Sequence, residues 1–203
     1  MFPMIGVTIP MDLSKNCNSA KREIVPILAV IGTSGSGKTT LIECIVKNLT
    51  DGGLRVGTVK HVHHHGFTID TEGKDTWRHS KAGARVVICV SPNEMVKIRH
   101  RLSPHDNDLG SALNSVREDN LDLLILEGFR SEVSGNERIQ KIVVAKDEKS
   151  LQKVLENVKS PLLAISGPVA NGTDLKLDKG VPLIDIPRNR EQLIQRIFNA
   201  FML

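Results

Sequence analysis

The segment "GTSGSGKT", residues 32–39, places three glycines, a lysine and a threonine within eight positions. It matches the pattern G-x-x-x-x-G-K-S/T, in which glycines let the backbone turn tightly and point several N–H groups at a phosphate. The lysine offers a positive charge to the terminal phosphates, and the threonine hydroxyl is a ligand for magnesium. The pattern therefore predicts a nucleoside triphosphate site that also holds Mg²⁺.

The predicted phosphate site includes the loop and the start of the helix that follows it. Lys38 is also expected to act in catalysis, because its charge offsets the charge that develops as the terminal phosphate is released. A glycine turn that meets the pattern by chance is the alternative, but an apolar run precedes this loop and a helical pattern follows it, as phosphate binding requires. The residues predicted to bind the nucleotide here are Thr33, Ser34, Gly35, Ser36, Gly37, Lys38, Thr39 and Thr40, and Thr39 is also a predicted metal ligand.

A second chemical group stands near the end of the apolar run "LDLLILEGF", residues 121–129. P-loop proteins commonly use such a strand to place a carboxylate near magnesium and the attacking water, and here that carboxylate is Glu127. The alternative is an acid that merely marks the solvated end of a strand. We predict that Glu127 binds magnesium and orients the water.

The segment "VKHVHHHGFTID", residues 59–70, carries four of the seven histidines of the chain. In an extended chain His61, His63 and His65 share one face, and alternating imidazoles suit zinc or nickel. A closed metal site needs further ligands, and no cysteine or carboxylate lies at a customary spacing from these histidines.

The position of this segment favours a different role, since it follows a predicted strand at the edge of the sheet where α/β folds bind ligands. Lys60, His61 and His63 are then candidate donors to phosphate. Asp70 is a candidate magnesium ligand and a candidate, beside Glu127, for orienting the water. Three interpretations stay open: a phosphate-linked loop, a transition-metal site and a merely polar surface.

Short apolar runs alternate with helical patterns along the chain from residue 24. The run "EIVPILAVIG" lacks polar alternation, as expected of a strand covered on both faces, and residues 38–49 space their apolar side chains as one helix face. "RVVICV" and "MVKIRHRL" are also predicted strands, and Asn189 is a predicted helix cap. This alternation predicts an α/β fold of the P-loop NTPase type, with three α/β/α layers and a mainly parallel sheet. Residues 24–203 are expected to form a single nucleotide-binding domain, and residues 1–23 a loosely ordered extension.

Composition narrows the possible partners. The 27 basic and 23 acidic residues are spread along the chain, and the low aromatic content of 3% disfavours a nucleic-acid-binding protein. The three cysteines fit no ligand spacing and predict free thiols in a reducing cytoplasm. No run is long enough to span a bilayer, and the first residues lack the layout of an export signal.

Four segments together resemble the molybdopterin-guanine dinucleotide biosynthesis protein B (MobB) family of small P-loop GTPases. They are "GTSGSGKTTL", "VKHVHH" followed by "FTID", "GKDTWRHSKAGA" and "LILEGFR", in the order and approximate spacing of that family. The resemblance is dense over residues 27–144.

This resemblance implies a cytoplasmic homodimer that binds GTP with Mg²⁺ and hydrolyses it slowly. It also implies a partner, the molybdenum cofactor guanylyltransferase, which joins GMP to molybdopterin. By position, residues 35–40 would hold phosphate and magnesium. The polar surround of the family would comprise His61, His63, His64, Asp70, Lys74, Asp75 and Glu127.

The chain also departs from the family pattern. Thr76 replaces the serine of "GKDS", and His65 stands at a variable position, so a metal site that needs His65 is not implied. "VVAKDE" lacks the N-K-x-D spacing that recognises guanine in many GTPases, so guanine preference is implied by the resemblance alone. Two other functions stay open, a small-molecule kinase with a lid near Arg99 and Arg101 and a metal-delivery protein that uses the histidines.

Overall fold

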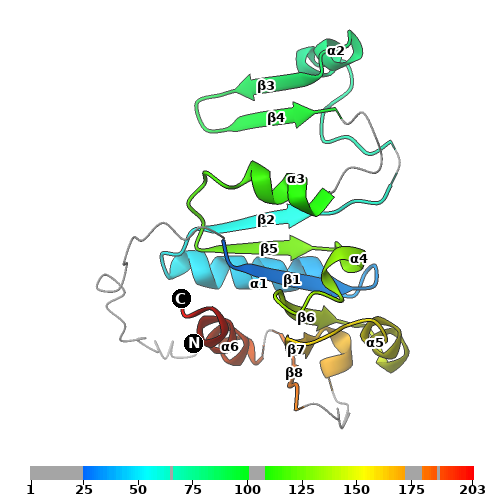
Figure 1. Cartoon of the computed structure of the whole chain (residues 1–203), viewed down its shortest axis with the longest axis vertical. Coiled ribbons are helices and arrows are strands. Elements are labelled where there is room, and N and C mark those ends of the chain that lie inside the picture. Colours follow the sequence, from blue (N-terminus) through cyan, green and yellow to red (C-terminus); the bar gives the residue numbers. More distant parts are fainter. Residues whose placement is uncertain (1–24, 65, 101–107, 172–179, 187) are drawn as a thin grey trace, which may run out of the picture.

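A computed structural model describes residues 25–64, 66–100, 108–171, 180–186 and 188–203 of the chain (Figure 1). The predictions for the 1–23 extension, for His65 and for Arg101 lie outside these residues.

A six-stranded parallel sheet forms the centre of the fold. Its strand order is β2-β5-β1-β6-β7-β8, so the strand before the predicted phosphate loop, β1, lies between β5 and β6 (Figure 1). The strands are β1 (Ile27–Gly32), β2 (Val56–Lys60), β5 (Leu123–Glu127), β6 (Gln140–Val144), β7 (Leu162–Ser166) and β8 (Leu183–Ile184). Because all six strands are parallel, the loops that follow them meet at one edge of the sheet.

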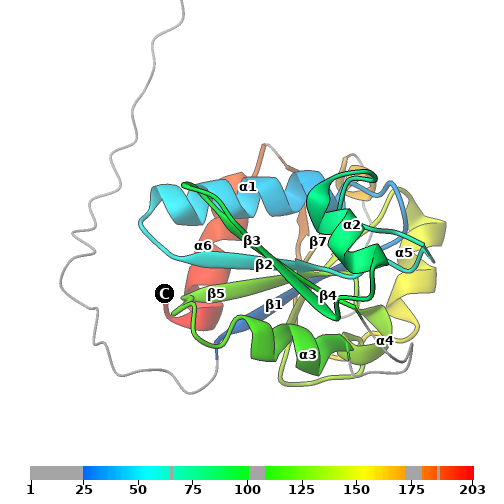
Figure 2. The ribbon, with the colours of Figure 1, turned by 90° about the horizontal axis from the view of Figure 1, so that it is seen from above.

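Helices cover both faces of this sheet, so the predicted three-layer α/β/α fold is confirmed (Figure 2). One face carries α1 (Lys38–Asp51) and α6 (Arg190–Phe201), and the other carries α3 (Asp108–Ser115), α4 (Arg130–Val133) and α5 (Glu148–Leu155). A 3₁₀ turn, η2 (Pro168–Ala170), follows β7. In the part of the chain that the structure describes, no helix combines the length and apolar character needed to cross a membrane.

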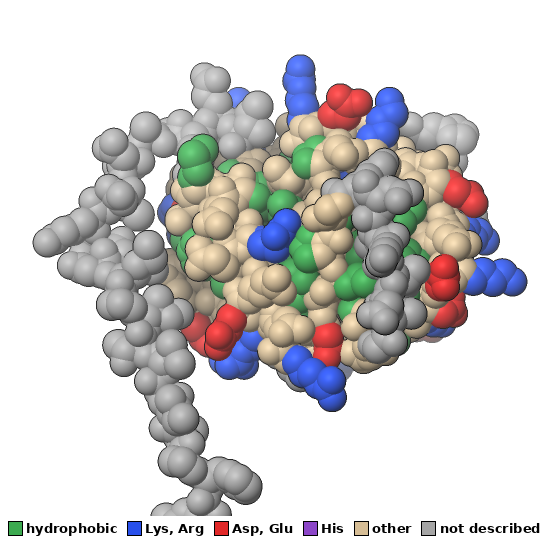
Figure 3. Space-filling model, turned by 90° about the horizontal axis from the view of Figure 1, so that it is seen from below, with side chains coloured by type: hydrophobic (Ala, Val, Ile, Leu, Met, Phe, Trp, Pro, Cys, Tyr) green, Lys and Arg blue, Asp and Glu red, His purple; other side chains and the backbone are tan. Residues whose placement is uncertain are grey.

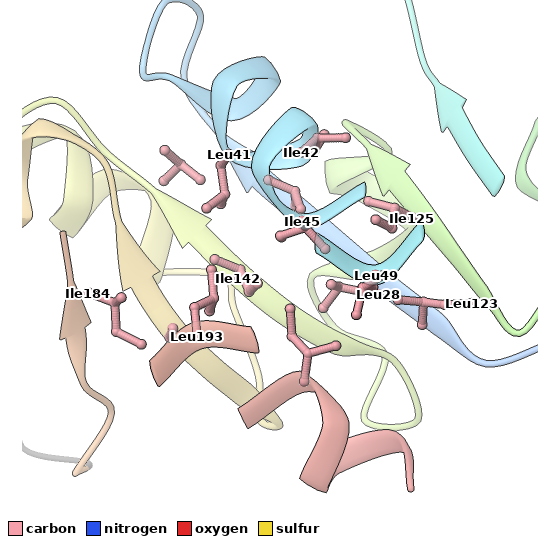
Figure 4. Close-up of a cluster of buried hydrophobic side chains, with 14 residues drawn as sticks. Leu28, Leu41, Ile42, Ile45, Leu49, Leu123, Ile125, Ile142, Ile184 and Leu193 are labelled. Carbon is pink, nitrogen blue, oxygen red and sulfur yellow. The ribbon is translucent and has the colours of Figure 1, made fainter. Parts of the chain in front are cut away.

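The core has two halves because successive side chains of a strand point to opposite faces. Leu28 and Val30 of β1 pack toward α1 and α6, whereas Ala29 and Ile31 pack toward the other layer. Figure 4 shows the first half, in which α1 side chains such as Ile45 meet side chains of the sheet. A central strand buried on both faces explains why "ILAVI" has no polar alternation.

Two of the predicted strands do not join the main sheet. β3 (Val86–Val90) and β4 (Met95–Arg99) form a separate antiparallel hairpin, which lies with α2 (Asp75–Lys81) beyond α3 and β2 (Figure 1). Val87 is buried, whereas the opposite face of the hairpin exposes large apolar side chains. We call this face the apolar hairpin face; its apolar members are Val86, Ile88, Val90 and Met95, and Lys97 and Arg99 share it.

The prediction of a side-chain cap at Asn189 is wrong. Asn189 precedes α6 but its side chain makes no cap hydrogen bond. The cap with full side-chain geometry lies instead at α5, where the Asp147 carboxylate accepts a hydrogen bond from the Ser150 backbone N–H at 2.7 Å. Hydrogen bonding from Ser150 lowers the pKa of Asp147, because it stabilises the ionised carboxylate.

Charges of both signs are mixed on the face at the β8 end of the sheet (Figure 3). Lysine and arginine side chains stand beside aspartate and glutamate around a centre of apolar and neutral groups. On this face the described side chains form a mixed pattern and not the basic stripe that follows a nucleic-acid backbone.

Candidate nucleotide site

The loop between β1 and α1, residues 32–39, is called the P-loop below. Gly35 and Gly37 have φ angles of +64° and +95°, a left-handed conformation that glycine adopts without steric cost. Gly37 directly precedes α1, so the loop leads into the positive end of the helix dipole. Backbone N–H groups at such a helix start bind phosphate.

Lys38 lies folded against the P-loop itself. Its Nζ donates hydrogen bonds to the backbone oxygens of Gly32 at 3.0 Å and Thr33 at 2.7 Å. Burial lowers the pKa of Lys38, the Glu127 carboxylate opposes that shift, and the charges of Lys60 and Lys146 add to it. The amine is therefore close to the loop and can exchange carbonyl partners for phosphate oxygens.

The sheet register brings Glu127 next to the start of α1. Val30 of β1 and Lys60 of β2 both pair with Glu127 in the parallel ladders. The Thr39 hydroxyl lies 3.5 Å from Glu127 Oε1, and Lys60 Nζ lies 3.2 Å from the same oxygen. Four of the residues predicted from sequence, Lys38, Thr39, Lys60 and Glu127, thus surround one point at the carboxyl edge of the sheet.

The oxygen atoms at this point fit magnesium, which prefers hydroxyl, carboxylate, phosphate and water oxygens. Thr39 and Glu127 supply a hydroxyl and a carboxylate within 3.5 Å of each other. The buried hydroxyl oxygens of Thr33 and Ser36 have no hydrogen-bond partner among the described residues. Because buried polar atoms are normally paired, these two hydroxyls indicate that the loop has capacity for a polar ligand.

The His61 side chain packs at the root of the histidine segment. Its Nε2 lies 3.0 Å from Asp108 Oδ2, its ring stacks on Phe129 with 4.8 Å between centroids, and its backbone N–H donates to Glu127 O at 2.9 Å. Gly128, with φ of +93°, leaves room for this packing, since a Cβ there would lie 3.3 Å from His61 Cβ. His61 Nε2 is therefore engaged by a carboxylate, Nδ1 is buried without a partner within the described residues, and the contact of His61 with phosphate stays a prediction.

Two members of this arrangement, Asp108 and Phe129, were missed by the sequence reasoning. Asp108 is 47 positions from His61 and starts a helix on the other side of the hairpin. No spacing rule connects residues that far apart. The dipeptide "GF" after Glu127 was the one hint in the sequence that another segment packs here, because a glycine at a strand end permits a close backbone approach.

The rest of the histidine segment is more exposed. His63 stands edge-on to His61 with 4.2 Å between ring centroids and is exposed. Within the ranges described, no group of three or more His, Cys, Asp or Glu side chains is placed to hold a metal ion. His65, on which the alternating-imidazole metal site depends, lies outside those ranges.

Asp70 is held by the residues around α2. Its Oδ1 accepts hydrogen bonds from the Thr71 N–H at 2.9 Å and from the Thr76 hydroxyl at 2.8 Å. Its Oδ2 is buried and has no partner among the described residues. Thr76, the residue that departs from the family pattern, therefore keeps a hydroxyl function, and the magnesium role of Asp70 stays a prediction.

Two further residues, Asp147 and Arg99, were considered from sequence for guanine recognition and for a kinase lid. Asp147 of "VVAKDE" caps α5, so its carboxylate is already bonded to backbone. Arg99, proposed for a kinase lid, is an exposed residue at the end of β4. Lys74 and Asp75 lie at the start of α2, where Asp75 is 3.7 Å from Arg78.

Comparison with protein families places these features in context. The family model described as molybdopterin guanine dinucleotide synthesis protein B matches residues 27–167. The molybdopterin-guanine dinucleotide biosynthesis adapter protein of Escherichia coli is 30% identical over 167 residues, which cover 82% of this chain and 89% of that relative. The protein of the same description from Haemophilus influenzae is 33% identical, and the match covers 81% of this chain and 83% of the relative.

Solved structures agree with the fold. The crystal structure of Bacillus subtilis MobB superposes with a TM-score of 0.66 at 26% identity, covering 84% of this chain and 97% of that one. A crystal structure titled molybdopterin-guanine biosynthesis protein B gives a TM-score of 0.63 at 29% identity, covering 87% of this chain and 99% of the other.

Proposed function

Because the chain belongs to the molybdopterin guanine dinucleotide synthesis protein B (MobB) family, we propose that it binds GTP together with Mg²⁺ at the P-loop. In this proposal the chain is an adapter in molybdopterin-guanine dinucleotide biosynthesis and assists the guanylyltransferase that joins GMP to molybdopterin. The observation that supports nucleotide binding most strongly is the convergence of Lys38, Thr39 and Glu127 at the start of α1. Guanine preference is drawn from the family.

Each residue of the site has a task in this proposal. Lys38 leaves the carbonyls of Gly32 and Thr33 and donates to the terminal phosphates. Thr39 and Glu127 hold Mg²⁺, directly or through water, and Glu127 orients the attacking water. When bound, Mg²⁺ supplies positive charge at the phosphate oxygens.

The proposal is tested by titrating the full chain with GTP and with ATP, each with Mg²⁺ and with EDTA. We expect saturable one-site binding of GTP that depends on Mg²⁺, with ATP weaker by about tenfold or more, since a site that hydrogen-bonds one base leaves polar groups unpaired with another. Isothermal titration calorimetry measures both affinities. If ATP binds as tightly as GTP or more tightly, the proposed preference for guanine is wrong. If neither nucleotide binds, the proposed function is refuted.

Hydrolysis by the isolated chain is expected to be slow, as predicted from the family. The charged side chains that act on Lys38 are Glu127, Lys60 and Lys146, and none of these three is an arginine that could supply charge to the terminal phosphate. Replacing Glu127 by glutamine should lower the single-turnover rate of GTP hydrolysis by about tenfold, which is less than a fully developed general base contributes. Glu132→Gln, on α4, serves as a control with the same change of charge. An unchanged rate for Glu127→Gln would contradict the proposed role.

We also propose that the chain forms a homodimer through the apolar hairpin face. Ile88 is 54% exposed, and Val90 and Met95 are more than two-thirds exposed. An isolated two-stranded hairpin is only marginally stable in water, so a second copy that covers this face would stabilise it. The hairpin lies beyond α3 and β2, apart from the main sheet (Figure 1), and the exposure of these side chains leaves them available to a second copy.

The proposed location is the cytoplasm, as expected from the cysteine content. Cys44 and Cys89 are both free thiols, and Cys89 is exposed on β3. Exposed thiols persist in a reducing compartment.

A further inference from the structure

A second lysine reaches the P-loop from the side opposite Glu127. Lys146 follows the end of β6, and β6 flanks β1 on the side away from β5. A Cβ built on Gly35 would lie 3.2 Å from Lys146 Nζ and 3.4 Å from its Cε. The end of this side chain therefore lies against the P-loop backbone, where a residue larger than glycine would displace it. We infer that Lys146 is a further nucleotide-binding residue, one that contacts the phosphates nearer the nucleoside; this inference rests on the proposed function.

The charges around the P-loop support this assignment. Lys38 is bonded to P-loop carbonyls, and Lys60 is paired with Glu127 at 3.2 Å. The Asp147 carboxylate beside Lys146 caps α5 by accepting a hydrogen bond from the Ser150 N–H. Three ammonium groups, of Lys38, Lys60 and Lys146, thus stand against the carboxylates of Glu127 and Asp147, and a bound polyphosphate offsets the excess of positive charge.

Mutual repulsion between the lysines is consistent with this proximity. The charge of Lys146 contributes to the lowered pKa of Lys38, which requires the two ammonium groups to be close enough to interact. A phosphate between them would be attracted by both. The exposed position of Lys146 leaves its ammonium group accessible to a ligand that enters from solvent.

The position of Lys146 also indicates which phosphates it contacts. Thr39 and Glu127, the metal-binding pair, lie on the β5 side of β1 and mark the end of the site where the terminal phosphate and Mg²⁺ belong. Lys146 lies on the β6 side, across Gly35. Its contact is therefore with the α- and β-phosphates, which GTP and GDP share.

The experiment compares three variants of the full chain by calorimetry with Mg²⁺ and either a non-hydrolysable GTP analogue or GDP. Lys146→Met removes the charge and keeps the apolar stem, Lys146→Arg keeps the charge, and Lys153→Met removes one charge from the far end of α5. We expect Lys146→Met to weaken both ligands by about tenfold, the size of one hydrogen bond to a charged group. The affinity of Lys146→Arg for both ligands should stay within about threefold of the parent's, and the affinity of Lys153→Met should equal the parent's.

Several results would overturn this inference. Parent-like affinity of Lys146→Met for both ligands removes Lys146 from the site, and the proposed function survives if the parent binds GTP and Lys38→Ala does not. Weaker binding of the GTP analogue alone would place Lys146 at the terminal phosphate and contradict the assignment to the α- and β-phosphates. A parent chain that binds no nucleotide would refute the proposed function and this inference together. Thermal unfolding of each variant shows whether the fold is retained.

Discussion

Replacing Lys38 by alanine is expected to weaken Mg²⁺-dependent GTP binding by about 100-fold or more, which corresponds to about 2.7 kcal/mol. The variant removes a positively charged side chain that is hydrogen-bonded to two P-loop carbonyls. Charge-assisted hydrogen bonds to phosphate are stronger than neutral ones, and Lys38 is placed to make more than one. Calorimetry with GTP and Mg²⁺ measures the loss.

The control for this variant is Lys47→Ala on the same helix. Lys47 pairs with Asp51 at 3.0 Å on an exposed face of α1, so its loss removes an equal charge and a surface ion pair only. We expect GTP affinity within about twofold of the parent, because an exposed ion pair of this kind contributes little. Lys38→Ala that binds GTP as the parent does, with the fold intact by circular dichroism, would show that the P-loop is not the nucleotide site.

Replacing Ile88 by aspartate is expected to convert the proposed homodimer to monomer, with a dimer dissociation constant raised by about 100-fold or more. Burying a carboxylate in an apolar interface removes it from water at a cost of about several kcal/mol, which is more than a single apolar contact contributes. In the hairpin itself Ile88 lies opposite Lys97, so the new carboxylate gains a cross-strand partner and the monomer is expected to keep its fold. Sedimentation velocity over a range of concentrations measures the dissociation constant.

A matched control uses another exposed apolar side chain. Met202 is 85% exposed at the end of α6, far along the chain from the hairpin, and its φ of +52° is a conformation that aspartate tolerates. The dimer dissociation constant of Met202→Asp should equal that of the parent. A parent chain that stays monomeric at every concentration would refute pairing through the apolar hairpin face, and so would an Ile88→Asp variant that stays dimeric.

The two variants also separate nucleotide binding from assembly. Ile88 lies in the β3–β4 hairpin, which is a sheet of its own, whereas Lys38 lies in the P-loop that follows β1 of the main sheet. If the two properties are independent, Lys38→Ala remains dimeric and Ile88→Asp still binds GTP. Loss of both properties in either variant would show that the site and the dimer interface are coupled, a connection for which His61 and Asp108, at the two ends of the hairpin insertion, are the first residues to test.

Features of this protein that follow from local physical rules could be predicted from the amino-acid sequence. Backbone conformation and helix dipole act over a few residues, so "GTSGSGKT" predicted a phosphate loop between β1 and α1, and the structure has a loop there that leads from β1 into α1. Apolar runs without alternation predicted strands covered on both faces, and the three-layer parallel fold is confirmed. The acid at the end of β5 was also readable, because parallel strands end at a common edge.

Which distant residues meet, and which strands share a sheet, could be learned only from the folded chain. The alternation in "MVKIRHRL" indicated a strand exposed on one face, but nothing local showed that β3 and β4 leave the main sheet and pair as a separate hairpin. Asp108 meets His61, and Lys146 meets Gly35, across separations for which the chain carries no spacing signal. Such contacts depend on strand order and on how helices pack across the sheet, which are properties of the whole chain and not of any segment.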